Sequence, residues 1–314
     1  MLGIVALPTA AFAATTYPVT STADAGAGTL REAIGFANAN PGSDAVTFAL
    51  PDNSVIQLLS AVTITDGLSI DGSGTPGLYI TGQGGLGTFA LLIIAPDIAD
   101  QGFSVSDVLF DGTADSTPGW QGVAIDTSLG IVNDRARSLT LTRITGRNIN
   151  SADLQGPALR DVVMQPGGPI TITDSTFTNN TSSASTLNGG GAVFIQGTSG
   201  LVTVTGSTFF GNTARSGGAT FFEGGGGGVA TLAAVSSTFT GNTANGAASI
   251  PASDGEGGAI AATTIGDVTI TGSTFIQAPE PSRIRAPPTE GFAIGRGRSA
   301  QGVLVVLAGM VSSR

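Results

Sequence analysis

The stretch STFTNN at residues 175–180 returns down the chain as STFFGN at 207–212, STFTGN at 237–242 and STF at 273–275. The phenylalanines of these copies are 32, 30 and 36 residues apart. A period of about 20 to 50 residues is typical of stacked supersecondary units, each of which buries its apolar side against its neighbours. The period therefore predicts a solenoid in place of a conventional globular core.

An alternating apolar and threonine stretch precedes the copies, as in ITIT at 170–173, LVTVT at 201–205 and VTIT at 268–271. Alternation of period two with β-branched residues indicates half-buried strands whose aliphatic side chains point inward. A glycine pair and a second apolar run, such as GGAVFI at 190–195, complete the repeat. Because each repeat holds about three short strands and no helical period, the pattern predicts an all-β chain folded as a right-handed parallel β-helix.

The register extends upstream with less fidelity, and it suggests two ladders of side chains. We expect an inward ladder, with a spacing of about 4.8 Å between coils, that consists of Phe110, Ile144, Phe177, Phe209, Phe239 and Phe275. We expect a second ladder, at a turn, that consists of Asn148, Asn180, Asn212 and Asn242. Asparagine suits a turn because it tolerates left-handed backbone and can hydrogen-bond its copy in the next coil. We interpret both ladders as structural.

Composition excludes several classes of chemistry. The 314 residues include 48 glycines but no cysteine and no histidine. The chain therefore has no disulfide, no thiolate metal ligand and no Ser-His-Asp triad. Its net charge of −10 argues against nucleic acid and anionic membranes as partners, since a phosphate polymer would be repelled.

The two ends differ in composition from the repeats. Residues 1–13 combine an apolar run with Ala-Phe-Ala at 11–13, which is typical of the second half of a secretory signal peptide; a first strand of the fold is the alternative. Residues 278–314 carry five of the twelve arginines but two of the 22 acidic residues. We interpret this tail as aberrant and disordered, as a frameshifted reading would produce. Its apolar run at 302–310 is too short for a transmembrane segment.

A single short helix is expected near the N-terminus. Leu30, Ala33, Ile34 and Ala37 fall on one helical face, and Pro41-Gly42 follows. A solenoid needs its open end covered, so we expect this helix to cap the first coil. The chain is thus divided into a partial signal peptide (1–13), an N-terminal cap module (14–60), β-helix coils (61–277) and the tail (278–314).

The phrase GTLREAI at 28–34, followed by ANANPG at 37–42 and DAVTF at 44–48, resembles the CSLREA-type N-terminal module of secreted bacterial β-helix proteins. The cysteine that gives the module its name is absent here. The STFxGN repeats are similar to those of polymorphic outer-membrane and autotransporter-passenger-like proteins of the pectate-lyase-like superfamily. The resemblance covers about residues 15–277 and implies a β-helix that is secreted or displayed on the bacterial surface. The group includes adhesins as well as pectate-lyase-like enzymes.

Five of the seven arginines outside the tail fall within residues 135–160, with aspartates among them. The lyases of this superfamily use an arginine or lysine as base, with carboxylates that hold Ca²⁺ on an acidic sugar. The resemblance thus implies Arg143 and Arg147 as candidate catalytic bases, Asp107 and Asp134 as candidate Ca²⁺ ligands, and Trp120 as a candidate sugar-binding platform. The alternative is that these residues form exposed ion pairs without a catalytic role.

Outward threonines of the expected strands would form a regular array: Thr140 and Thr142, Thr171 and Thr173, Thr203 and Thr205, and Thr269 and Thr271. Such arrays bind ice on some flat β-solenoids, although threonine is also common on exposed strands. Regular repeats and the absence of a defined catalytic set favour a secreted or surface-displayed protein with a structural and adhesive role towards glycans or cells. A polysaccharide lyase acting on acidic polysaccharide is the alternative. A paired-carboxylate glycosidase, using Asp107 and Asp111 or Asp174 and Asp267, ranks below it.

Overall fold

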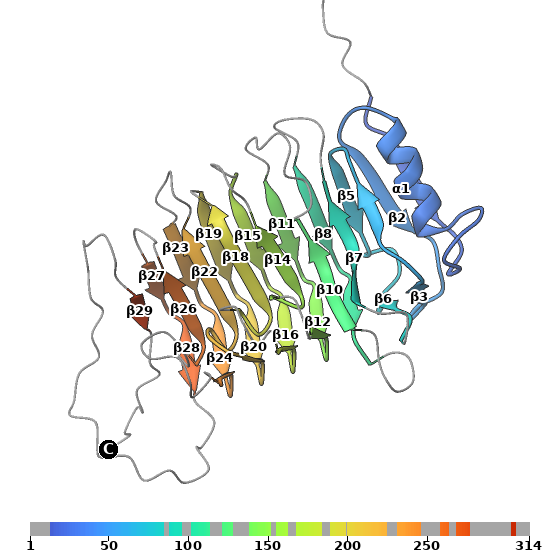
Figure 1. Cartoon of the computed structure of the whole chain (residues 1–314). Coiled ribbons are helices and arrows are strands. Elements are labelled where there is room, and N and C mark those ends of the chain that lie inside the picture. Colours follow the sequence, from blue (N-terminus) through green and yellow to red (C-terminus); the bar gives the residue numbers. More distant parts are fainter. Residues whose placement is uncertain are drawn as a thin grey trace, which may run out of the picture.

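The computed structural model of the chain is an elongated stack of coils with one helix at its N-terminal end (Figure 1). It describes residues 13–84, 88–95, 102–113, 121–127, 138–151, 155–162, 168–183, 189–198, 200–224, 231–245, 258–263, 268–276 and 303–305. Within these ranges the strands form three sheets that run along the stack, and each coil from β2 to β26 contributes to all three. The expected parallel β-helix is therefore confirmed.

Sheet 1, as we name it, contains the alternating apolar and threonine stretches. Its nine described strands, in spatial order, are β1 (Thr16–Val19), β2 (Asp44–Phe48), β5 (Leu68–Asp71), β8 (Phe103–Ser106), β11 (Leu139–Thr142), β15 (Ile170–Thr173), β19 (Leu201–Thr205), β23 (Thr231–Val235) and β27 (Val268–Thr271). Neighbouring strands are parallel, as where Ile170 lies beside Val202 and Thr171 beside Thr203. The aliphatic side chains are buried inside the coil and the hydroxyl side chains face outward, as period two predicts.

Sheet 2 contains the phenylalanines of the repeated motif. Its eight described strands are β3 (Val55–Leu58), β6 (Tyr79–Gly82), β9 (Leu109–Asp111), β12 (Thr145–Arg147), β16 (Thr176–Thr178), β20 (Thr208–Phe210), β24 (Thr238–Thr240) and β28 (Thr274–Ile276). The rings of Phe177, Phe209, Phe239 and Phe275 stack in register, with centroid distances of 4.9, 4.7 and 4.9 Å between successive rings. This part of the expected inward ladder is confirmed.

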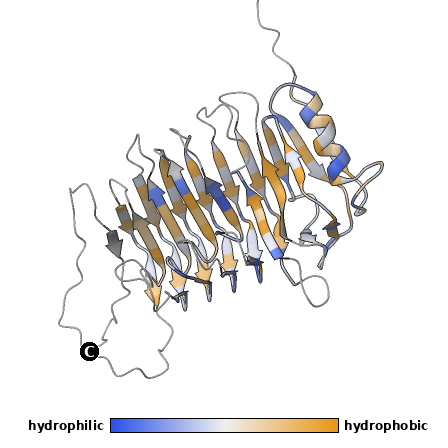
Figure 2. Cartoon of the chain, in the orientation of Figure 1, coloured by the Kyte–Doolittle hydropathy of each residue, from blue (hydrophilic) through white to orange (hydrophobic). Residues whose placement is uncertain are grey.

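Sheet 3 closes the coil. Its twelve described strands are β4 (Val62–Ile64), β7 (Thr88–Ile94), β10 (Gln121–Asp126), β13 (Asn150–Ser151), β14 (Leu159–Val162), β17 (Thr181–Ser182), β18 (Val193–Thr198), β21 (Thr213–Ala214), β22 (Thr220–Gly224), β25 (Thr243–Ala244), β26 (Ile260–Thr263) and β29 (Val303–Val305). Among the pairs described, β29 differs because it lies antiparallel to β26. Figure 2 shows apolar residues along the strands of the stack, which is where the buried core lies.

The inward ladder of sheet 2 differs from the expected one at a single coil. Gly146, and not Ile144, lies between Phe110 and Phe177. A side chain has no room there, since a Cβ on Gly146 would lie 2.8 Å from the Cβ of Ala158 and 3.3 Å from the ring of Phe177. Ile144 is buried two residues earlier, where its backbone N–H donates to the hydroxyl of Ser175. The assignment of Ile144 to this position was wrong.

The asparagine ladder is confirmed for three of its four members. Asn180, Asn212 and Asn242 are buried, and each of the first two donates its Nδ2 to the Oδ1 of the next. Asn148 is wrong as the fourth member, because Ile149 occupies that position and donates its N–H to Oδ1 of Asn180. The left-handed backbone also lies one residue earlier, at Asn148 and Asn179 and at the glycines that follow them in later coils.

The glycine pairs allow two stretches of backbone to approach closely. A Cβ on Gly191 would lie 2.7 Å from the backbone nitrogen of Thr213, and one on Gly218 would lie 2.5 Å from that of Thr243. The following alanines, Ala192 and Ala219, are fully buried. At Gly191 and Gly218 glycine is therefore required by close packing between sheet 3 segments, whereas Gly217 also has left-handed backbone with a φ of 63°.

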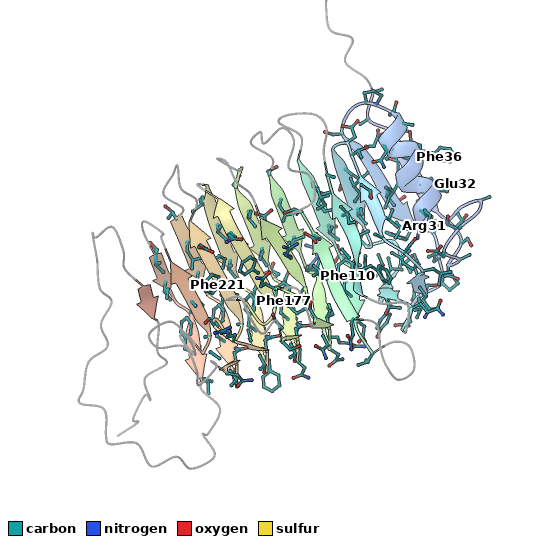
Figure 3. All side chains as sticks on the ribbon, in the orientation of Figure 1. Arg31, Glu32, Phe36, Phe110, Phe177 and Phe221 are labelled. Carbon is teal, nitrogen blue, oxygen red and sulfur yellow. The ribbon has the colours of Figure 1, made fainter. Side chains whose placement is uncertain are left out.

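The expected capping helix is confirmed as α1 (Leu30–Ala39), whose buried face consists of Leu30, Ala33, Ile34 and Ala37. Thr29 is its N-cap and accepts a hydrogen bond from the N–H of Glu32, while a carboxylate oxygen of Glu32 accepts one from Gly28. Arg31 ties the helix to the coil by donating to the carbonyl oxygens of Ser60 and Ala61 (Figure 3). The domain boundaries remain predictions, and the partial signal peptide falls almost entirely outside the described residues, as does the tail apart from β29.

Candidate functional site

Asp107 and Arg143, two of the charged residues singled out in the sequence, lie at the corner between sheets 1 and 2. One residue of each turn here has left-handed backbone: Asp107, Arg143 and Asp174 have φ of 57°, 51° and 49°, and Gly206 follows at 59°. Aspartate and glycine are common in this conformation, whereas arginine is unusual there. The turn therefore stacks Arg143 between two aspartates of neighbouring coils, an arrangement we call the charged corner.

Arg143 and Asp107 form a two-point ion pair. The Nε and Nη2 atoms of Arg143 lie 2.8 and 2.7 Å from the two carboxylate oxygens of Asp107. The hydrogen bond to Asp107 and the charges of Asp107, Asp174 and Asp71 raise the pKa of Arg143. The side chain is 56% exposed, so the pair lies at the surface of the molecule. The structure thus brings together one predicted base and one predicted Ca²⁺ ligand.

Arg147 forms a second ion pair on β12. Its Nε atom lies 2.7 Å from a carboxylate oxygen of Asp111, and its guanidinium lies over the ring of Tyr79 at 5.3 Å from the ring centroid. Burial alone would raise the pKa of Asp111, but hydrogen bonds from Thr113 and Arg147 outweigh it and lower that pKa. The hydrogen bond to Asp111 in turn raises the pKa of Arg147. Both arginines are therefore held in the charged form.

These pairs bear on the predicted catalytic roles. A general base must be deprotonated, and carboxylate partners that raise the pKa of a guanidinium work against that. A Ca²⁺ ion takes six to eight oxygen ligands, and in the part of the chain that the structure describes no three acidic residues gather to hold a metal. Asp134 and Trp120 lie outside the described residues. The catalytic, Ca²⁺-binding and sugar-binding assignments all remain predictions.

Two neighbours of the predicted residues were not chosen as site residues from the sequence. Asp111 was considered only as part of a carboxylate pair with Asp107, but each takes a different arginine. Tyr79 lies 68 residues before Arg147 and reaches it across two coils. The register of sheet 2, in which Tyr79, Leu109 and Thr145 are adjacent, is the signal that would have linked them.

The outer side of sheet 1 carries a second surface of interest. On β8, β11, β15 and β19 the outward side chains form two columns, which we call the hydroxyl face: Ser104, Thr140, Thr171 and Thr203 in one column, and Ser106, Thr142, Thr173 and Thr205 in the other. All eight are partly exposed. These eight side chains carry hydroxyl groups and no charge, while Asp71 on β5 follows Ser106 in the second column and the charged corner borders the face.

Comparison with known proteins places these coils among established repeats. Two stretches match the Chlamydia polymorphic membrane protein repeat. They are residues 174–196 and 236–263, each of which begins at the turn before an STF motif. No curated protein matches the chain. The expected similarity of the STFxGN repeats to this family is therefore confirmed for these coils.

Solved structures also match the chain. One is Jun a 1, the major allergen from cedar pollen, at 14% identity over 87% of this chain and 82% of that chain, with a TM-score of 0.23. The fold assignment rests instead on the three parallel sheets themselves. Among the described residues, no helix has the length and apolar character needed to cross a membrane.

Proposed function

We propose that this chain is a β-helix protein of the bacterial surface or outer membrane with a structural and adhesive role, which contacts glycans or other cells through its outer faces. The repeat it matches is named for membrane proteins, which supports a location at the cell envelope. The stack is elongated, so it presents long, regular outer faces (Figure 1). Arg143 and Arg147 are each paired with an aspartate within the chain, so we look for the contact among the uncharged outer side chains.

The observation that carries the glycan assignment is an exposed aromatic ring on sheet 2. Phe210 is 49% exposed and lies in register between Thr178 on one side and Thr240 on the other. An aromatic face among hydroxyl groups suits a sugar ring, since its apolar C–H face can pack on the aromatic ring while neighbouring hydroxyls hydrogen-bond. We assign the outer side of β16, β20 and β24 as the glycan contact.

The test measures binding of the full chain to immobilised neutral and acidic polysaccharides and to bacterial and host cells. We expect binding to at least one, and a loss of about tenfold in affinity for Phe210→Ala, which corresponds to about 1.4 kcal/mol. Phe36→Ala is the matched control, because Phe36 is a similarly exposed ring (53%) on α1. Folded protein that binds none of these surfaces, or equal losses for the two variants, would contradict the proposal.

The lyase alternative has one observation in its favour, the exposure of Arg143 beside Arg147 on adjoining segments of one coil. Two guanidiniums could hold the carboxylates of an acidic polysaccharide. The full chain is incubated with acidic polysaccharides with and without Ca²⁺, and unsaturated product is followed by absorbance. Turnover that Arg143→Ala or Arg147→Ala abolishes would replace the adhesive proposal by the lyase. We expect no turnover, since both arginines are held charged.

A further inference from the structure

The hydroxyl face is regular in two directions. The strands are aligned so that Ser104 lies beside Thr140, Thr140 beside Thr171, and Thr171 beside Thr203. The second column repeats this arrangement two residues later in each strand. Figure 1 shows β8, β11, β15 and β19 as successive strands along the stack. Parallel strands of a sheet are about 4.8 Å apart, and residues i and i+2 of a strand about 6.6 Å apart. The face is therefore a lattice of hydroxyl groups with two fixed spacings.

The threonines of this lattice do not use their hydroxyls within the protein. In the described ranges none of the six donates its Oγ1–H to another residue, whereas at the N-terminal end of the face Ser104 donates to Ser69 and Ser106 to Asp71. The aliphatic residues between them, such as Ile172 and Val204, are buried in the core and fix the backbone beneath. The free hydroxyls therefore face solvent on a rigid support.

The spacing along the stack is close to one found in ordered water. In a tetrahedral network with O–H···O distances of about 2.75 Å, second-neighbour oxygens lie about 4.5 Å apart. The difference from the strand spacing is about 0.3 Å per coil, so over the three steps of the hydroxyl face it reaches about 0.9 Å, a fifth of the repeat. Each column can thus follow one row of water oxygens across all four coils.

We propose that the hydroxyl face binds ice. A single hydroxyl gains nothing by exchanging liquid water for ice, because both supply hydrogen bonds. Binding free energy is gained when many hydroxyls occupy lattice positions at the same time and the protein needs no further ordering. A rigid sheet holds the hydroxyls in place before binding and so meets this condition. The absence of charge fits an uncharged crystal surface, and the threonine methyl groups between the hydroxyls add apolar area that leaves liquid water on contact.

The lattice is interrupted after β19. Ala233 and Val235 take the two outward positions on β23, and threonines return as Thr269 and Thr271 on β27. Ala233 and Val235 end the face on its C-terminal side, and the carboxylate of Asp71 on β5 ends the second column on the N-terminal side. This interruption offers a gain-of-function experiment that does not depend on loss of folding.

The first experiment freezes a solution of the full chain slowly and measures the fraction of protein incorporated into ice, together with inhibition of ice recrystallisation. We expect incorporation of the wild type, and a decrease of about tenfold or more for Thr171→Lys, since burying or displacing a lysine charge at the ice surface costs more than about 1.4 kcal/mol. Thr181→Lys is the matched control because it adds the same charge to the same coil on sheet 3, away from the hydroxyl face and from the assigned glycan contact. Circular dichroism confirms that all variants are folded.

The second experiment uses Ala233→Thr with Val235→Thr, which would join the four-coil face to β27. We expect both ice incorporation and recrystallisation inhibition to rise above wild type. Exclusion of the folded wild type from ice, or equal incorporation of Thr171→Lys and Thr181→Lys, would overturn the proposal. Loss of glycan binding in Thr171→Lys with no effect on ice would overturn it too and assign the face to glycans, whereas the proposal for Phe210 would stand or fall separately.

Discussion

Asn212 illustrates how one buried amide can join three coils. Its Oδ1 accepts hydrogen bonds from the backbone N–H and the Nδ2 of Asn180, and its Nδ2 donates to the carbonyl of Phe177 and to Oδ1 of Asn242. All of these groups are buried, so each would be costly without a partner. At this scale the repeat is held by polar side chains as well as by stacked rings.

Asn212→Ala should lower the free energy of unfolding by about 2–4 kcal/mol, because it leaves several buried donors and acceptors without partners. Asn179→Gly is the control from the neighbouring coil: Asn179 is exposed, has a φ of 53°, and is replaced by Gly211 in the next coil. We expect that variant to stay within about 0.5 kcal/mol of wild type. Urea titration followed by circular dichroism measures both. Equal changes in the free energy of unfolding for the two variants would show that the asparagine ladder contributes little to stability.

Asp111 should make stability depend on pH in the acid range. Its pKa is lowered in the folded state from the ordinary value of 3.8. A group with a depressed folded pKa stabilises the fold fully above its unfolded pKa and loses that contribution as pH falls through the folded value. The melting temperature should therefore fall below about pH 4, and Asp111→Asn should fall less steeply. Asp52→Asn, at an exposed position, controls for net charge. An unchanged slope in Asp111→Asn would contradict this assignment.

The residue-scale errors of the sequence analysis have a common physical cause. Ile144 and Gly146 are both inward and differ by two residues, so alternation of period two fits either one. The Asn-Asn pair at 179–180 offered two possible alignments for Asn148, and the wrong one was chosen. The pattern identifies which side a residue faces, but the length of each turn, which sets the register, does not appear in it.

At the scale of the element, the glycine pair decides how closely sheet 3 segments pack. A Cβ on Gly218 would collide with the carbonyl of Gly258 and lie 2.5 Å from the nitrogen of Thr243. Both are backbone atoms of the next coil and cannot move independently of its strands. The glycines and the strand after them could be predicted from the sequence. The reason that they recur, the close approach of backbone between neighbouring coils, could not.

Gly218→Ala should destabilise the protein by about 1–3 kcal/mol, since the added methyl group forces backbone apart in a packed region. Gly35→Ala is the matched substitution: Gly35 lies inside α1, and a Cβ there meets nothing within 4 Å. Because alanine favours the helix interior, that variant should gain about 0.5–1 kcal/mol. Melting temperatures compare the two. A stable Gly218→Ala variant would show that the coils can separate at low cost.

At the scale of the whole molecule, the fold is a one-dimensional stack in which each coil contacts its neighbours. The strand pairs run from β1 to β27 on sheet 1 and from β3 to β28 on sheet 2 without a change of direction. In such a stack stability is close to a sum of coil and interface terms. The sequence could predict this architecture because the same alternation of inward apolar residues recurs from coil to coil. It could predict the cap because the apolar residues of α1 follow a helical period instead. The charged corner was predicted as a cluster, whereas its pairing depends on register.

The position of a substitution along the stack should therefore decide how far its effect spreads. Phe209 is fully buried between the rings of Phe177 and Phe239, whereas Phe275 packs on one ring and is only partly buried. Phe209→Ala removes both ring contacts and should cost about 3–5 kcal/mol. Hydrogen exchange measured by mass spectrometry should then speed up in coils on both sides of β20. Phe275→Ala removes one contact at the last described coil, so faster exchange should be confined to β27 and β28.

Because both variants delete the same side chain, they differ only in their position along the stack. Uniform protection changes in both would mean that the protein unfolds as one cooperative unit and that the stack does not behave as a chain of neighbouring coils.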